Sequence, residues 1–219
     1  MQVDIRGRPS FAHLAATLEV GETLTIESGA MASMSANIRL TARWNGGFFA
    51  AWMRKLFGGE SLFVNDVTSS NGRPCEIMLT QATPGDMMAI TLTNTVMYLQ
   101  RGAYIAHSPG VTLGVSWAGF SSLFGGEGLF RLKVSGSGTV WIGAYGALSQ
   151  REISDALIVD SGHLVAYEPS IQLKAKLAAG LFGSFFSGEG IVLKLSGRGR
   201  VLLQSRSIEG LARWTNGHI

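Results

Sequence analysis

The sequence predicts an all-β protein in which three β units of similar sequence follow one another within a single domain, residues 1–219. Three observations support this prediction. Apolar and polar residues alternate in 17–27, 87–100 and 138–145, which is typical of half-buried strands. Twenty-nine glycines against five prolines indicate many tight turns. Three segments also align with one another without a gap, which indicates an internal repeat.

The aligned segments are ESGAMASMSANIRL (27–40), QRGAYIAHSPGVTL (100–113) and DSGHLVAYEPSIQL (160–173). They share a glycine, at Gly29, Gly102 and Gly162, and a polar residue two positions before it. They also share two closing apolar residues, spaced as on one face of a strand: Ile38 and Leu40, Val111 and Leu113, and Ile171 and Leu173. The approximate units are therefore 17–83, 84–149 and 150–207.

Turn signals separate the strands. The first unit starts with two strands around a Gly-containing turn in TLEVGETLTIE (17–27), and Pro84-Gly85-Asp86 predicts a turn before the second unit. SGSG (135–138) and SGRG (196–199) predict bends between adjacent strands of the second and third units. The corresponding stretch of the first unit, FVNDVTSSNGRPCEI (63–77), lacks this G-x-G bend.

Each unit also contains an aromatic-rich stretch: WNGGFFAAWMRKLFGGESLF (44–63), WAGFSSLFGGEGLFRL (117–132) and KLAAGLFGSFFSGEGIVLKL (176–195). In the first of these, the bulky apolar residues of 48–57 recur at helical spacing, while Arg54 and Lys55 point elsewhere. This pattern predicts a short amphipathic helix near residues 48–57.

If the units surround a pseudo-threefold axis, the three stretches emerge at one end and form an apolar cap. The candidate residues are Phe48, Phe49, Trp52, Phe57, Trp117, Phe120, Phe124, Phe182, Phe185 and Phe186, with Arg54 and Lys55 as a cationic rim. Three interpretations stay open: core between β layers, a homo-oligomer interface, or docking on a bilayer. In the last, Arg54 and Lys55 would face anionic headgroups.

The composition favours an assembled protein. Hydrophobic residues make up 46% and charged residues 15%, which indicates that oligomer contacts or a membrane surface hide apolar area. The net charge of +3 is a weak argument for nucleic acid, and no lysine-arginine cluster occurs. No apolar run resembles a signal peptide or reaches about 18 residues, so a cytoplasmic location, with possible peripheral membrane association, is expected.

No motif for chemistry is found. The four histidines lack metal-ligand spacing, and Cys75, the single cysteine, cannot form a disulfide within the chain. His163 occupies the repeat position of Ala30 and Ala103, which favours a packing role. Glu60, Glu127 and Glu189 recur after glycine turns, so a structural role is favoured for them too. With no G-x-S-x-G elbow either, we expect no catalytic residue, metal or cofactor and no enzyme activity.

Several blocks resemble a known family: LFGGESLFVNDVTS, TPGDMMAITL, GAYIAHSPGV, LFGGEGLFRLKVSGSGTVWIGAYG, VDSGHLVAYE and SGEGIVLKLSGRGRVLLQSRS. They are similar to a widespread prokaryotic domain of unknown function and to the family named for altered inheritance of mitochondria, number twenty-four, over roughly residues 10–208. The resemblance implies a fold like that of the tryptophan RNA-binding attenuator protein (TRAP-like), with sandwich layers like a double-stranded β-helix. It also implies a link of mitochondrial members to inner-membrane organisation, and it brings no catalytic residues.

The sequence therefore predicts a non-enzymatic, self-assembling β scaffold that presents an apolar surface to a membrane or a partner protein. A homo-oligomer is expected, a trimer or a multiple of three. The alternative, suggested by the fold analogy and the basic pI, is an RNA-binding β oligomer. Its candidate residues are Arg198, Arg200 and Arg206, of which the first two are spaced as on one strand face.

Overall fold

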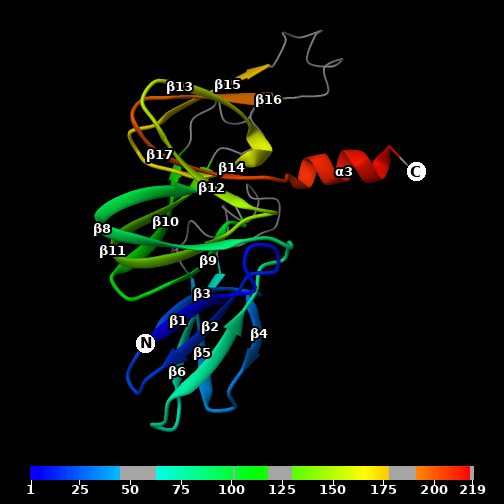
Figure 1. Ribbon diagram of the computed structural model, residues 1–219. Helices are drawn as coiled ribbons and strands as arrows, with labels where there is room; N and C mark the ends of the chain where they lie inside the picture. Colours follow the sequence, from blue (N-terminus) through cyan, green and yellow to red (C-terminus); the bar gives the residue numbers. More distant parts are fainter. Residues whose placement is uncertain (45–62, 101, 118–129, 178–190, 218–219) are drawn as a thin grey trace.

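The computed structural model describes residues 1–44, 63–100, 102–117, 130–177 and 191–217. Antiparallel strands dominate this part of the chain, so the all-β prediction is confirmed. Figure 1 shows the strands stacked in layers: the N-terminal strands lie at one end, β8 to β11 in the middle, and β13, β15 and β16 at the other end. The predicted helix at 48–57 lies outside the described residues.

The N-terminal strands are β1 (Gln2–Arg6), β2 (His13–Leu18), β3 (Leu24–Glu27), β4 (Met31–Met34), β5 (Ile38–Trp44), β6 (Phe63–Ser69) and β7 (Cys75–Leu79). β1, β2, β7 and β4 form an antiparallel sheet in this order. Every second residue of β2 is buried, because successive side chains of a strand point to opposite faces. The boundary predicted at residue 17 falls inside β2, which pairs with β7 as one strand.

The middle strands are β8 (Met87–Leu99), β9 (Tyr104–His107), β10 (Val111–Trp117) and β11 (Phe130–Gly143). β8 and β11 pair along most of their length, and the register shifts at Gly136 and Ser137. The predicted SGSG bend therefore lies inside one strand rather than between two. The ladder continues because Asn94 of β8, with φ of 53°, is the extra residue opposite the shift.

The C-terminal elements are β12 (Leu148–Ile153), β13 (Ala156–Asp160), the 3₁₀ turn η2 (Ser161–His163), β14 (Leu164–Tyr167), β15 (Gln172–Leu177), β16 (Ile191–Ser196), β17 (Gly199–Gln204) and the helix α3 (Ile208–Asn216). β13, β16 and β15 form a three-stranded sheet. The SGRG bend lies between β16 and β17, as predicted, and residues 70–74 connect β6 to β7 without such a bend.

One ten-stranded sheet runs through all three layers, in the order β12-β17-β14-β8-β11-β9-β3-β6-β5, with β10 beside β11. Two antiparallel contacts join the layers within it. β3 pairs with β9 through Thr25↔His107 and Ile26↔Ala106. β8 pairs with β14 through Tyr98↔Tyr167 and Leu99↔Ala166.

The core has three clusters, one for each layer. The first includes Leu14, Leu18, Leu24 and Leu79, the middle one Val134, Val140 and Ile142, and the last Leu164, Leu195 and Val201. Cys75 belongs to the first cluster, and burial raises the pKa of its thiol. An inert, packed thiol fits this environment.

Pro84-Gly85-Asp86 lies in the bend between β7 and β8, as predicted. The buried carboxylate of Asp86 forms an ion pair with Arg8, with Nε–Oδ1 at 2.7 Å and Nη2–Oδ2 at 2.9 Å. This two-pronged contact fixes the segment before β2 to the bend.

Candidate functional site

The predicted aromatic cap lies almost entirely outside the described residues. Phe48, Phe49, Trp52, Phe57, Arg54 and Lys55 fall in 45–62, Phe120 and Phe124 in 118–129, and Phe182, Phe185 and Phe186 in 178–190, together with Glu60, Glu127 and Glu189. Trp117 is the exception: it is the last residue of β10, and its backbone pairs with Phe130.

The strands that carry these segments are described. The three segments connect β5 to β6, β10 to β11 and β15 to β16, and each pair is an antiparallel ladder. The ladders extend to Trp44↔Phe63, Trp117↔Phe130 and Leu177↔Ile191, respectively. Each aromatic segment therefore begins and ends at strand residues that are paired with one another.

A second apolar surface, which the sequence analysis missed, lies on α3. Ile208, Leu211 and Trp214 are exposed by 54%, 43% and 64%, and no residue of the helix is buried. Figure 1 shows α3 leading away from the strand layers. These side chains share one helical face, opposite Glu209 and Arg213, since residues three and four apart are neighbours on a helix. The last described element is thus an amphipathic helix whose apolar side chains are largely exposed.

The helix has a recognisable beginning. Ser207 is extended, and its hydroxyl oxygen accepts a hydrogen bond from the Gly210 N–H at 3.1 Å, which is typical of an N-cap. The signals were present in the sequence: a capping serine, apolar residues at 208, 211 and 212, and Gly217 after the last turn. None of the helices in the described ranges is long and apolar enough to cross a membrane.

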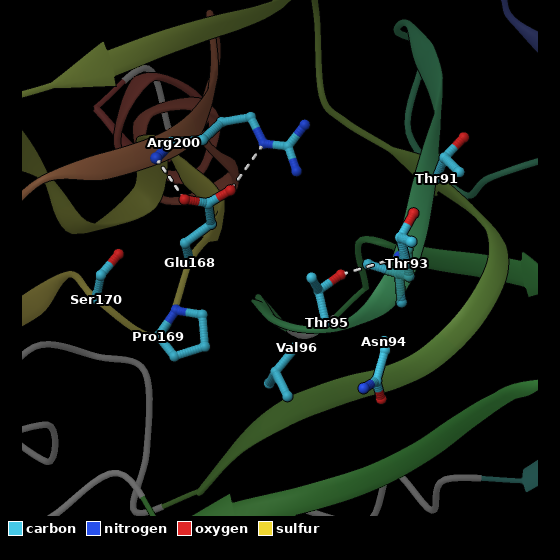
Figure 2. Close-up of a pocket in the computed structure, with 10 residues that line it drawn as sticks. Thr91, Thr93, Asn94, Thr95, Val96, Glu168, Pro169, Ser170 and Arg200 are labelled. Atoms are coloured by element: carbon cyan, nitrogen blue, oxygen red, sulfur yellow. Dashed lines mark hydrogen bonds and ion pairs between the residues drawn. The ribbon is translucent and has the colours of Figure 1, made fainter.

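A shallow pocket of about 480 Å³ with a mixed polar and apolar lining lies where the bulged part of β8 meets the turn between β14 and β15. Figure 2 shows Thr91, Thr93 and Thr95 on one side and Glu168, Ser170 and Arg200 on the other. Glu168 accepts a hydrogen bond from the Arg200 backbone N–H at 3.1 Å, and its other oxygen lies 3.3 Å from Arg200 Nε. The two charges offset each other, so the remaining polar groups of the lining are the hydroxyl groups of the threonines and Ser170 and the amide of Asn94.

We expect Glu168→Gln to lower the free energy of unfolding by less than about 1 kcal/mol. The side chains of Glu168 and Arg200 are 33% and 28% exposed, so water screens the pair. The amide oxygen of glutamine would still accept the Arg200 N–H. Urea unfolding at low and high salt measures this loss, which should shrink as salt rises. A salt-independent loss several times larger would contradict this view of the pair.

The three arginines of the RNA-binding alternative differ in setting. Arg198 is exposed in the bend before β17, Arg200 lies in β17 and pairs with Glu168, and Arg206 is exposed after β17. Arg198 and Arg200 therefore do not lie on one strand, contrary to what their spacing suggested, because the SGRG bend separates them.

The described histidines have structural surroundings, and no group of metal-ligating side chains occurs within the described ranges. His163 Nδ1 lies 2.8 Å from the Gln204 carbonyl oxygen, which fits the packing role predicted for it. His107 is buried where β3 meets β9, beside Tyr104. The Tyr104 hydroxyl lies 3.2 Å from the Thr25 carbonyl and 3.3 Å from His107 Nδ1.

These distances indicate which atom donates in each hydrogen bond of the buried group formed by Thr25, Tyr104 and His107. A carbonyl only accepts, so Tyr104 donates its single proton to Thr25, and His107 Nδ1–H donates to the phenol oxygen. Burial, and then the charge of Arg43, lower the pKa of His107 to about 4, while Asp66 opposes them. Burial also raises the pKa of Tyr104. Both groups are therefore neutral at pH 7, and their hydrogen bonds link β3 to β9.

Comparisons with known proteins agree with this architecture. The family described as Mitochondrial biogenesis AIM24 matches residues 3–206. An uncharacterized protein of Streptococcus pyogenes serotype M6, M6_Spy0233, is 26% identical over 204 residues, covering 89% of this chain and 82% of that protein. The crystal structure of SPYM3_0169 from Streptococcus pyogenes superposes with a TM-score of 0.80 at 24% identity, covering 100% of this chain and 99% of that one. The last similarity establishes a shared fold.

Proposed function

Since the chain belongs to the Mitochondrial biogenesis AIM24 family, we propose that it is a non-enzymatic, self-assembling β scaffold that presents an apolar surface to a membrane or a partner protein. The observation that carries this proposal is the large exposed area of the apolar face of α3. A nine-residue helix is marginal in water by itself, so a second surface that covers this face would also stabilise the helix.

The energy available from this face is substantial. Burying large apolar side chains such as Ile208, Leu211 and Trp214 stabilises a contact by about 1.5–3 kcal/mol each, before the costs of association. The aromatic segments at the ends of the three hairpins would add to this surface in our proposal. Arg54 and Lys55 would then favour an anionic bilayer.

The proposed scaffold consists of three repeats, and the strand registers support this. β4, β9 and β14 pair with β7, β11 and β17 through Met34↔Ile77, His107↔Val140 and Tyr167↔Val201. Each ladder then skips one residue, at Ala32, Ile105 and Val165. These three residues follow the aligned Gly29, Gly102 and Gly162 by the same number of positions. A bulge at one equivalent place in every unit is hard to explain without an internal repeat.

In this proposal the layers adopt the TRAP-like arrangement that the family resemblance implies, and copies of the chain form a trimer or a multiple of three. The proposed role is architectural, because Glu168 and Arg200 of the pocket pair with each other and the polar groups of the layer junction hydrogen-bond to one another. The protein would act at a membrane surface or on a partner without chemistry of its own.

Flotation with lipid vesicles tests the presented surface. We expect wild type to float with vesicles that contain anionic lipid, and the double variant Leu211→Asp/Trp214→Asp to stay behind, because carboxylates on the apolar face oppose burial. Phe11→Asp is the control, since Phe11 is 76% exposed and lies far from α3 in the sequence. It should float like wild type.

Light scattering with and without mild detergent completes this test. A wild-type mass that falls in detergent, while the double variant has the smaller mass throughout, would support contact between copies of the chain through the apolar face. Equal flotation of wild type and double variant, with masses that detergent leaves unchanged, would contradict the proposed role of the apolar face of α3.

A further inference from the structure

Two strand edges at opposite ends of the molecule are free in the described part of the chain. β13 pairs with β16 on one side only, and β4 pairs with β7 on one side only. Figure 1 shows β13 in the layer at one end of the stack and β4 at the other, so they cannot pair within one molecule. Free edges present unpaired N–H and C=O groups that another strand can use.

The corresponding strands of the other units are paired. β3, β8 and β13 pair with β6, β11 and β16, respectively. In these three ladders the residues that face Asp66, Lys133 and Lys194 occupy equivalent positions. They are Thr25, Tyr98 and Ile158. In the same way, His107, Tyr167 and Met34 are equivalent. The two layer junctions join Thr25 to His107 and Tyr98 to Tyr167. Only the third combination, Ile158 with Met34, is left without its junction in the described structure.

The exposed fractions of the side chains also differ between the two junctions and the two free edges. His107 and Tyr167, which lie in the two junctions, are 4% and 3% exposed, whereas their counterpart Met34 is 42% exposed. Thr25 is 5% exposed, whereas its counterpart Ile158 is 58% exposed. Two large apolar side chains are thus uncovered where the repeat would bury them.

Neither edge carries the usual protection against strand pairing. β4 (MASM) and β13 (ALIVD) contain no lysine, arginine or proline, and one carboxylate, Asp160, ends β13. The bulge in β4 does not prevent pairing, because β9 and β14 have the equivalent bulge and still pair on their other side.

We infer that β13 of one copy pairs with β4 of the next copy as antiparallel strands, with Ile158 opposite Met34 and Val159 opposite Ser33. This contact would repeat, between molecules, the junction that β3–β9 and β8–β14 make within one. It rests on the self-assembly proposed above and names the surface responsible. Because the two edges differ, the contact is head-to-tail and gives a ring or an open array.

Charged variants at the edges test this inference by light scattering. Wild type should exceed the 23.3 kDa of one chain, and Ile158→Lys should fall to that mass. Val20→Lys is the matched control, because Val20 is 57% exposed against 58% for Ile158 but lies in a turn. Met34→Lys should also be monomeric. An equal mixture of Ile158→Lys and Met34→Lys should give dimers, since each variant keeps the edge that the other has lost.

Cysteine cross-linking tests the register. The Cα atoms of facing residues in antiparallel strands are about 4.5–5.5 Å apart, within the range that a disulfide spans. We expect Ile158→Cys mixed with Met34→Cys to form disulfide-linked dimers on oxidation, and either variant alone to form none. Cys75 can stay, because it is buried, and wild type should not cross-link.

The outcomes separate the two proposals. A wild type that is monomeric at all concentrations would overturn self-assembly and this contact together. An oligomeric wild type whose mass is unchanged by Ile158→Lys and Met34→Lys would overturn the edge contact but leave self-assembly standing. Cross-links within either single-cysteine variant would contradict the head-to-tail arrangement.

Discussion

Replacing Gly85 with alanine is expected to lower the free energy of unfolding by about 3 kcal/mol, at the upper end of the usual cost of overpacking. A Cβ at this position would lie 1.9 Å from the Ala144 carbonyl oxygen and 2.6 Å from the Gly146 nitrogen. Both neighbours are backbone atoms, so no side-chain rotation can relieve the overlap.

The surrounding hydrogen bonds prevent a larger backbone shift. Gly85 forms a parallel bridge with Gly146, and the Gly85 carbonyl accepts the Ala12 N–H at 2.9 Å. Asp86 N–H donates to the Gly146 carbonyl at 2.8 Å, and Gly146 N–H donates to Pro84 at 3.0 Å. Moving Gly85 away from Ala144 would therefore break contacts that join β2, β8 and the segment before β12.

Gly114→Ala is the matched control for urea unfolding of this variant. Gly114 lies in β10, and a Cβ there would meet nothing within 4 Å. Alanine at that position should be neutral or slightly stabilising, because it restricts the unfolded chain. Equal stability of the Gly85 and Gly114 variants would contradict the close packing around Gly85.

The sequence predicted local features of the fold well. Alternation located β3, β8 and the second half of β11, and Pro84-Gly85-Asp86 marked the bend before β8, whereas β2 begins before the alternating stretch 17–27. These features depend on neighbouring residues: side-chain direction has a period of two in a strand, and turn residues act within a few positions.

Features that depend on distant residues were not predicted. Nothing near Thr25 indicates that it pairs with His107, because that register follows from how two layers pack. The strand edges of β4 and β13 that are free among the described residues became visible only when the pairing of the described strands was known. In the sequence, nothing distinguishes Met34 and Ile158 from other apolar residues of strands.

The helix α3 was missed for a different reason. It is short, contains Gly210 and Thr215, which have low helix propensity, and lies beyond the last aligned repeat. None of its residues is buried, so the helix lacks the buried face that usually accompanies a helical pattern. The aromatic segments, by contrast, stood out from composition alone.

The buried His107 is expected to make stability depend on pH. Its pKa is lowered from 6.5 to about 4 in the folded protein, so the unfolded chain takes up the proton first as pH falls. The stabilisation is complete above pH 6.5 and is lost as pH falls towards 4. The difference corresponds to about 3 kcal/mol, of which about 2 kcal/mol would be lost by pH 5.

His107→Asn tests this expectation, because the asparagine amide can still donate a hydrogen bond towards the Tyr104 oxygen but does not titrate. The free energy of unfolding is measured for wild type and variant at pH 8, 7 and 5. Between pH 7 and 5 wild type should lose about 2 kcal/mol more than the variant, and between pH 8 and 7 the two should change alike. Carboxylates titrate in both proteins, so their contribution cancels in this difference. Parallel losses down to pH 5 would show that His107 is protonated as readily in the folded protein as in the unfolded chain, and that the junction between β3 and β9 does not exclude the charge.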